Sequence, residues 1–273
     1  STTRIGVENP CFREAINTFL LADAEVVPHP VDEEGIVLNE RPCDYYYVTP
    51  GHQVPTGVTM SSARRRQLLE HAARHDAVII EDDYDSESNF TLNPLPALKA
   101  SDRSGRVVYV SSLSKALSPG LRLGFMVADP DLIDEARALR RLVYRHPPTN
   151  IQYQMAHFLA QGHYETHLRR YHYDSAQRWE RLHAALQRYL PSCRALAGSE
   201  HANAFWLQTP AQINTQQLTW RAAHAGVLIE PGARHFLSAA PPDNYFRMGF
   251  HAINPDAIAQ GVEVLRGQLE QMG

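Results

Sequence analysis

The sequence predicts an open α/β sheet followed by a smaller α+β domain. The first observation is size, because 273 residues suffice for one large or two ordinary domains with a substantial core. The second is composition: 44% hydrophobic and 21% charged residues are typical of a globular protein rather than a disordered one. The third is an alternation of amphipathic helical segments with short, fully apolar runs, which is typical of strands buried on both faces of a parallel sheet.

The alternation is clearest between residues 62 and 80. Residues 62–76 have helical spacing, with Leu68 and Leu69 on one side, and residues 77–80 form an apolar strand. A helix followed by a buried strand is half of a βαβ unit. Further strands are predicted at 45–48, 106–110 and 121–127, and further helices at about 130–145 and 151–161.

A long amphipathic helix is predicted from about residue 163 to 190, where it ends before Pro191. Beyond it, strands are predicted at 204–207, 227–229 and 245–250, and helices at about 214–225 and 255–271. We therefore expect part of a large domain in residues 1–162 and an interdomain helix with a small domain in residues 163–273. Because strand-like residues begin almost at once, we expect the chain to start in the middle of the large domain.

Charge and targeting signals exclude several classes of function. The formal net charge is −4, without a block of like charge, whereas a nucleic-acid groove needs clustered Lys and Arg. No apolar stretch reaches the length of a membrane span, and residues 1–20 lack the pattern of a signal peptide. Three widely spaced cysteines fit reduced thiols better than a disulfide framework or a zinc site. We expect a soluble, cytoplasmic protein.

The densest polar cluster, Glu81 to Asp85, follows the predicted strand 77–80 directly. Carboxyl ends of strands in open α/β sheets are the usual place for ligands. A solvated acidic turn is the simplest interpretation, and a magnesium site is another, because paired carboxylates suit hard cations. The next segment favours neither.

That segment places a lysine among hydroxyl groups at the end of another strand. Ser112 and Ser114 precede Lys115, and Arg122 follows, after the strand 106–110. Pyridoxal 5′-phosphate needs an amine, a carboxylate for its ring nitrogen and an anchor for its phosphate, and these residues with Asp82 offer all three. Taken alone, the pattern would be a loop with an exposed lysine. The Pro- and Gly-rich residues 49–57 are either a rigid loop or a loop that lines the same crevice.

Five motifs together carry a resemblance to a known family. The succession VENP, TPGHQVPTG, IIEDDYDSE, SSLSKALSPGLRLGF and NYFRMGF resembles the aminotransferase-like domain of MocR/GabR-type regulators, a branch of the GntR superfamily. The resemblance covers about residues 5–271, and five motifs in this order are specific where one alone would be weak. It implies the type I fold of pyridoxal-phosphate enzymes, with an incomplete large domain here.

The resemblance also implies roles for individual residues. Lys115 would form the internal aldimine, and Asp82, or its neighbour Asp83, would pair with the pyridinium nitrogen. Tyr84 would reach the ring hydroxyl, while Ser112, Ser114 and Arg122 would hold the phosphate.

Two further residues complete the implied site. Arg247 would bind the carboxylate of an amino-acid ligand through its two-pronged guanidinium, the alternative being a structural ion pair. Phe12 would lie over the cofactor ring, although core packing explains it equally well. Metal binding by His163 and His167 is not favoured, since their spacing is not that of HExxH.

One departure from the pattern of aminotransferases favours a regulator. Val54 occupies the slot where they have an asparagine that hydrogen-bonds the ring oxygen, and valine cannot make that bond. We therefore expect an effector-sensing domain that binds an amino-acid-like ligand as an external aldimine, forms a homodimer, and contacts DNA only through an N-terminal winged helix-turn-helix absent from this chain. The alternative is an active aminotransferase, in which Lys115 would act as the general base.

Overall fold

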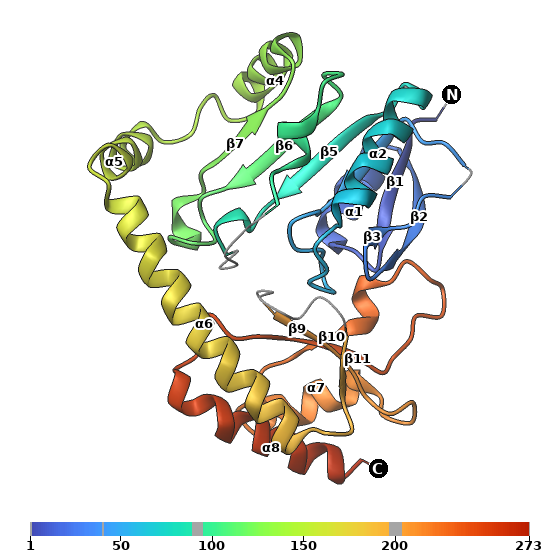
Figure 1. The fold of residues 1–273 in the computed structure, drawn as a ribbon, viewed down its shortest axis with the longest axis vertical. Helices are drawn as coiled ribbons and strands as arrows, with labels where there is room; N and C mark the ends of the chain where they lie inside the picture. The colour runs from blue at the N-terminus through green and yellow to red at the C-terminus, as the bar shows by residue number, and fades with distance from the viewer. Residues whose placement is uncertain (1, 40, 89–94, 197–203, 273) are drawn as a thin grey trace.

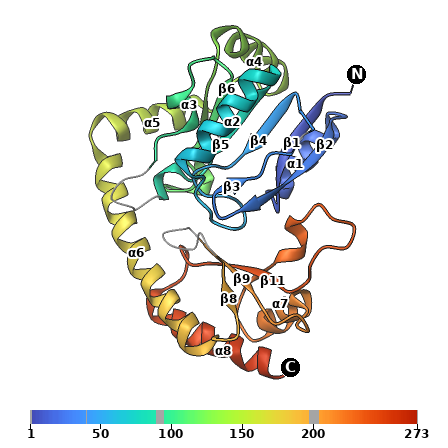
Figure 2. The same cartoon turned by 45° about the vertical axis from the view of Figure 1, so that its right-hand side comes forward.

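The computed structural model describes residues 2–39, 41–88, 95–196 and 204–272, which build two separate sheets (Figures 1 and 2). The larger is a seven-stranded sheet in the order β3-β2-β1-β4-β5-β6-β7. The pairs from β2 to β6 are parallel, and the two edge strands, β3 and β7, are antiparallel to their neighbours. The strands are β1 (Arg4–Asn9), β2 (Glu25–Asp32), β3 (Gly35–Ile36), β4 (Tyr45–Val48), β5 (Val78–Asp83), β6 (Val107–Ser112) and β7 (Gly124–Val127).

The centre of this sheet is apolar on both faces, as the short hydrophobic runs predict. Tyr46, Ile79 and Val107 are fully buried on three adjacent strands, and Leu68 packs with them from the covering helix α2. At the far edge, Gly124 begins β7. A Cβ atom there would lie 2.7 Å from the carbonyl oxygen of Ser111, so only glycine lets β7 pair this closely with β6.

Eight helices occur in the described part of the chain. The Ser61 side chain caps α2 by accepting a hydrogen bond from the Arg64 N–H group, and Asp76 ends it in the left-handed conformation. Figure 1 shows α2 lying against the large sheet and α6 running from α5 to the small sheet. The helices are α1 (Arg13–Leu21), α2 (Ser62–His75), α3 (Leu98–Ser101), α4 (Pro130–Val143), α5 (Thr149–Ala160), α6 (His163–Tyr189), α7 (Thr215–His224) and α8 (Ile258–Glu270).

The smaller sheet is antiparallel, in the order β10-β11-β9-β8, and has its own core. Phe205 and Phe246 lie buried between its strands, against Leu182 of α6 and Leu265 of α8. Because α6 begins at His163 and packs on α8, we propose a domain boundary near residue 162. The strands are β8 (Arg194–Ala195), β9 (Ala204–Gln208), β10 (Glu230–Pro231) and β11 (Tyr245–Gly249).

Two sequence-based expectations need correction. Residues 227–229 are not a strand: Leu228 is 85% exposed, and only Glu230–Pro231 pairs with β11. The strand predicted at 121–127 begins only at Gly124, because a 3₁₀ segment (Pro119–Leu121) precedes it. None of the described helices is both long enough and apolar enough to cross a membrane.

Candidate active site

The predicted site residues gather where β5 and β6 end. The two strands are parallel neighbours, with Asp82 opposite Val110 and Asp83 opposite Ser111. Ser112 is the last residue of β6, and the segment that carries Lys115 follows it. The acidic cluster and the serine-lysine segment therefore meet at one edge of the sheet, which is the usual ligand position in an open α/β fold.

The adjacent aspartates at the end of β5 point to opposite faces of the sheet, since side chains alternate along a strand. Asp82 accepts a hydrogen bond from the Tyr47 hydroxyl at 2.5 Å, whereas Asp83 accepts one from Tyr109 at 2.8 Å. Burial raises the pKa of both carboxyl groups, and each tyrosine hydrogen bond opposes that rise. Asp82 thus interacts with β4 and Asp83 with β6, and Asp82 stays the predicted partner of a ring nitrogen.

Lys115 is exposed, and its ammonium lies 5.5 Å from the centre of the Tyr84 ring. The chain holds only two lysines. The other, Lys99, donates to the Val107 carbonyl at 2.7 Å and lies 3.4 Å from the Asp102 carboxylate. Because that amine is committed to the loop before β6, Lys115 is the lysine available for a covalent bond.

The residues predicted to hold a phosphate lie between β6 and β7. The Oγ atom of Ser112 accepts a hydrogen bond from the backbone N–H group of Ser114 at 3.2 Å. Arg122 is exposed and has a φ of 48°, in the left-handed region that arginine seldom adopts. All three residues therefore share one short segment, and the two serines are in direct contact.

Arg247 lies on β11 of the small sheet, with its side chain 21% exposed. Its cross-strand neighbour on β10 is Glu230, whose Oε2 atom lies 3.4 Å from the Arg247 Nη1 atom. The hydrogen bond from His235 and the charges of Arg247 and Arg234 lower the pKa of Glu230 to about 2, against the effect of burial. Arg247 thus has an ion-pair partner within the protein, and its role in binding a carboxylate stays a prediction.

His251, two residues after β11, contacts the long helix α6. Its Nδ1 atom lies 3.3 Å from the Tyr171 hydroxyl and 3.2 Å from the Ser175 hydroxyl, both on α6. Burial, together with the positive charges of Lys115, Arg178 and Arg247, lowers the pKa of His251 to about 4, whereas the charge of Asp85 opposes this. That Lys115 and Arg247 act on one ligand stays a prediction.

Phe12 precedes α1 and is 38% exposed. Core packing, the alternative explanation, does not account for a ring this exposed. Its position over a cofactor ring stays a prediction.

A buried polar network at the end of β1 was not predicted from the sequence. Glu8 is only 2% exposed, and its Oε2 atom accepts hydrogen bonds from the Thr49 N–H at 3.2 Å, the Thr49 hydroxyl at 2.7 Å and the Gln53 side-chain amide at 3.3 Å. Burial raises the pKa of Glu8 to about 7. A glutamate next to Ile5 and Val7, in a short apolar stretch, is the signal that could have identified it.

The same network fixes the loop of residues 49–57. The Gln53 side-chain amide also donates to the carbonyl groups of Pro10 and Val54, and its oxygen accepts from the N–H and hydroxyl of Thr56. Next to it, the His52 Nδ1 atom lies 3.5 Å from the buried Asp85 carboxylate. The loop is thereby attached to the end of β1 and to the acidic cluster after β5.

Of the two helical histidines considered for metal binding, His167 is within hydrogen-bond distance of the Ala116 carbonyl, at 2.7 Å, and the ring of His163 packs near Phe158. Among the residues that the structure describes, no group of three or more His, Cys, Asp or Glu side chains is arranged to hold a metal ion. His167 instead contacts the residue next to Lys115.

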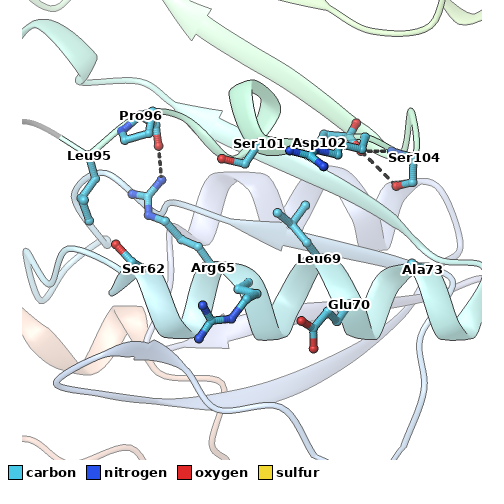
Figure 3. Close-up of a pocket in the computed structure, with 12 residues that line it drawn as sticks. Ser62, Arg65, Leu69, Glu70, Ala73, Leu95, Pro96, Ser101, Asp102 and Ser104 are labelled. Carbon is cyan, nitrogen blue, oxygen red and sulfur yellow. Dashed lines mark hydrogen bonds between the residues drawn. The ribbon is translucent and has the colours of Figure 1, made fainter.

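A surface cavity of about 670 Å³ lies along α2 (Figure 3). None of the predicted site residues lines it. Arg65, which borders the cavity, donates to the carbonyl groups of Met60, Pro96 and Pro50, so its guanidinium is already used to hold loops together. The polar residues at the ends of β5 and β6 are therefore the better candidate for chemistry.

Comparisons with known proteins identify the family and the fold. The model of the family "Aminotransferase class I and II" matches residues 48–265. The chain is 37% identical over 263 residues to the HTH-type transcriptional regulator TauR of Rhodobacter capsulatus, and 34% identical over 264 residues to the probable rhizopine catabolism regulatory protein MocR of Rhizobium meliloti. Each match covers 95% of this chain but only 54% and 53% of the relative, so the chain spans about half the length of these regulators.

A solved structure gives the same fold. LysN, the α-aminoadipate aminotransferase of Thermus thermophilus, was crystallised with N-(5′-phosphopyridoxyl)-L-leucine and superposes with a TM-score of 0.92 at 26% identity. The match covers the whole of this chain and 72% of LysN. The predicted type I fold and the resemblance to MocR-type regulators are thereby confirmed. The chain belongs to the aminotransferase class I and II family, and it is similar to about half the length of MocR-type transcription regulators.

Proposed function

We propose that this chain binds pyridoxal 5′-phosphate and senses an amino-acid-like effector. The observation that carries the proposal is the placement of the buried Asp82 carboxyl and the exposed Lys115 amine at the carboxyl ends of neighbouring strands. The match to regulators supports a sensing role, in which the chain reports on a metabolite to a DNA-binding part of the protein.

The donor set fits the cofactor. When bound, pyridoxal phosphate supplies an aldehyde that condenses with amines and a ring that withdraws electrons. Asp82 would accept a hydrogen bond from the protonated ring nitrogen, Lys115 would hold the cofactor covalently, and Tyr84 would contact the ring hydroxyl. The phosphate would be bound by the hydroxyl groups and the guanidinium of one segment, which are those of Ser112, Ser114 and Arg122.

The effector would carry an amino group and a carboxylate. Its amino group would take the place of the Lys115 amine, and its carboxylate would bind the Arg247 guanidinium. Because Arg247 lies on the small sheet and Lys115 follows a strand of the large one, a ligand that contacts both would change the packing of the two parts. Such a ligand shifts that equilibrium only by the difference in its affinity for the two arrangements.

A sensor is favoured over an active aminotransferase by the residue at position 54. Val54 offers no side-chain hydrogen bond to a ring oxygen, whereas its neighbour Gln53 is fully used in holding the loop. We also propose a homodimer and a cytoplasmic location for the whole regulator, since it acts on DNA and its fold is that of aminotransferases.

The test is a titration of the protein, preloaded with pyridoxal phosphate, with α-, β- and ω-amino acids, followed by the visible absorption of the cofactor. We expect a saturable spectral change without keto acid production at enzymatic rates. Sustained keto acid production would instead establish the aminotransferase alternative. An unchanged spectrum with every amino acid would contradict effector sensing.

Arg247→Ala should weaken the binding of the amino acid that gives this spectral response. The expected loss of binding free energy is roughly 2–5 kcal/mol, the order expected when a buried carboxylate loses its charged partner. The matched control is Arg234→Ala, because Arg234 also lies near Glu230, at 3.5 Å, but its side chain is half exposed. Equal losses in the two variants would show that Arg247 acts only through Glu230.

A further inference from the structure

Glu8 is a buried acid that the proposed function does not use. It is the last residue but one of β1, where its neighbours in the sheet are β2 and β4. None of the ion pairs among the described residues includes Glu8. A buried charge without a partner costs several kcal/mol, so its surroundings favour the neutral form.

The two oxygens of Glu8 have different surroundings. Its Oε2 atom accepts from three donors on Thr49 and Gln53, which lower the pKa of Glu8, whereas its Oε1 atom is buried and has no hydrogen-bond partner. An ionised carboxylate spreads its charge over both oxygens, and a buried oxygen without a donor would then be strongly unfavourable. Burial therefore outweighs the three hydrogen bonds, and the pKa of Glu8 is raised.

The acidic groups near Glu8 act in the same direction as burial. The Asp82 carboxyl on β5 raises the pKa of Glu8, and Glu8 in turn raises the pKa of the Tyr47 hydroxyl on β4 and of the Cys11 thiol. Tyr47 donates to Asp82 at 2.5 Å, which stabilises a negative charge on Asp82 rather than on Glu8. Two interacting buried carboxyl groups do not both ionise readily.

We propose that Glu8 is a positioning residue that retains its proton and so leaves the single negative charge of the pair on Asp82. Its second contribution is to hold Thr49 and Gln53, and with them the loop of residues 49–57, against the end of β1. The inference rests on the proposed function of Asp82 as the partner of a cofactor ring nitrogen.

The first test is the infrared carbonyl band of a protonated carboxylic acid in protein without added cofactor. We expect the parent protein to show this band at pH 6 and to lose it as the pH rises through about 7. Glu8→Gln should lack that band, and Asp82→Asn should retain it at pH 6. A spectrum unchanged by Glu8→Gln would overturn the proposal, because the proton would then reside elsewhere.

The second test is the affinity for pyridoxal phosphate. Glu8→Gln, neutral and of the same shape, should bind within about twofold of the parent, whereas Glu8→Ala, which loses the acceptor for Thr49 and Gln53, should bind at least tenfold more weakly. An equal loss in both variants would mean that a charged Glu8 is required. Should Glu8→Ala not fold, the Gln variant alone decides between a neutral and a charged acid. Absence of binding by the parent would overturn the proposed function, while the infrared band would still decide which carboxyl group holds the proton.

Discussion

The two sides of the candidate site, at the ends of the strands of the large sheet, are built very differently. On the side of β1, β4 and β5, the polar residues Glu8 and Gln53 are buried and joined by hydrogen bonds between segments more than 40 residues apart in the chain. On the side of β6, β7 and α4, Lys115 and Arg122 are exposed, and α4 contains no buried residue. The first side is fixed by the protein's own core, and the second is not. The difference therefore separates residues that stabilise the fold from residues that serve ligand binding.

This contrast assigns different consequences to substitutions on the two sides. A polar group in the fixed side is held in place before any ligand arrives, so its loss should reduce the stability of the fold. A residue on the exposed side has few contacts to lose, so its removal should affect ligand binding alone. The predictions below test that separation, beginning with the largest expected effect.

The largest difference is expected between two leucines. Leu68 on α2 is fully buried under the large sheet, whereas Leu142 on α4 is 84% exposed. Leu68→Ala should lower the free energy of unfolding by roughly 2–5 kcal/mol, and Leu142→Ala should change it by less than about 0.5 kcal/mol. Urea denaturation measures both changes. Similar losses of unfolding free energy in the two variants would contradict the proposed difference between the two sides.

A pH-dependent effect is expected at Glu8. Its pKa is about 7 in the folded protein against an ordinary value of 4.5, so the folded state binds the proton more tightly between these values. Stability relative to Glu8→Gln should therefore fall as the pH rises from about 4.5 to 7, by on the order of 3 kcal/mol in total, and stay level above. Unfolding of both proteins across this range is the measurement; parallel pH profiles would show that the pKa of Glu8 is the same in the folded and unfolded states.

Gln53→Ala should have a smaller effect on stability. It removes the hydrogen bonds that tie the loop of residues 49–57 to Pro10 and Glu8, and it leaves buried groups unsatisfied, which costs roughly 1–3 kcal/mol. The control is Gln216→Ala, at an exposed position of α7, where the change should stay below about 0.5 kcal/mol. Thermal unfolding distinguishes the two; equal midpoints would mean that the loop is not held by Gln53.

The smallest effect on stability is expected for Lys115→Ala, within about 0.5 kcal/mol of the parent, because the side chain is exposed. The same variant should abolish covalent attachment of pyridoxal phosphate. A large loss of stability would show that Lys115 supports the fold. The exposed side would then contribute to stability as well as to ligand binding.

Sequence patterns predicted the helices and strands whose residues show a regular hydrophobic periodicity. Residues 62–80 alternate from helical spacing to an apolar run, and they fold as α2 and β5. The run at 227–229 misled because it is apolar without being buried: Leu228 is exposed, and the Val227 N–H group donates to Ala222 to close α7. Apolar composition alone does not say whether a partner strand is present.

The same holds for the candidate site: residues marked by a local pattern were predicted, and residues marked only by distant contacts were not. Asp82 and Lys115 were found because each directly follows an apolar strand, and the structure places these strands side by side. Glu8 and Tyr47 were not found, because their partners lie 35 to 45 residues away in the chain. Contacts of this kind depend on strand order, which no local pattern encodes.

The central claim is that Lys115 holds pyridoxal phosphate, and the chain's two lysines make a direct test possible. The protein is incubated with pyridoxal phosphate, reduced with borohydride, digested and analysed by mass spectrometry, with Lys99→Arg and Lys115→Ala treated alike. We predict that the phosphopyridoxyl mass is found on Lys115 in the parent and in Lys99→Arg, and is absent from Lys115→Ala. Labelling of Lys99, or no labelling of the parent, would contradict the account.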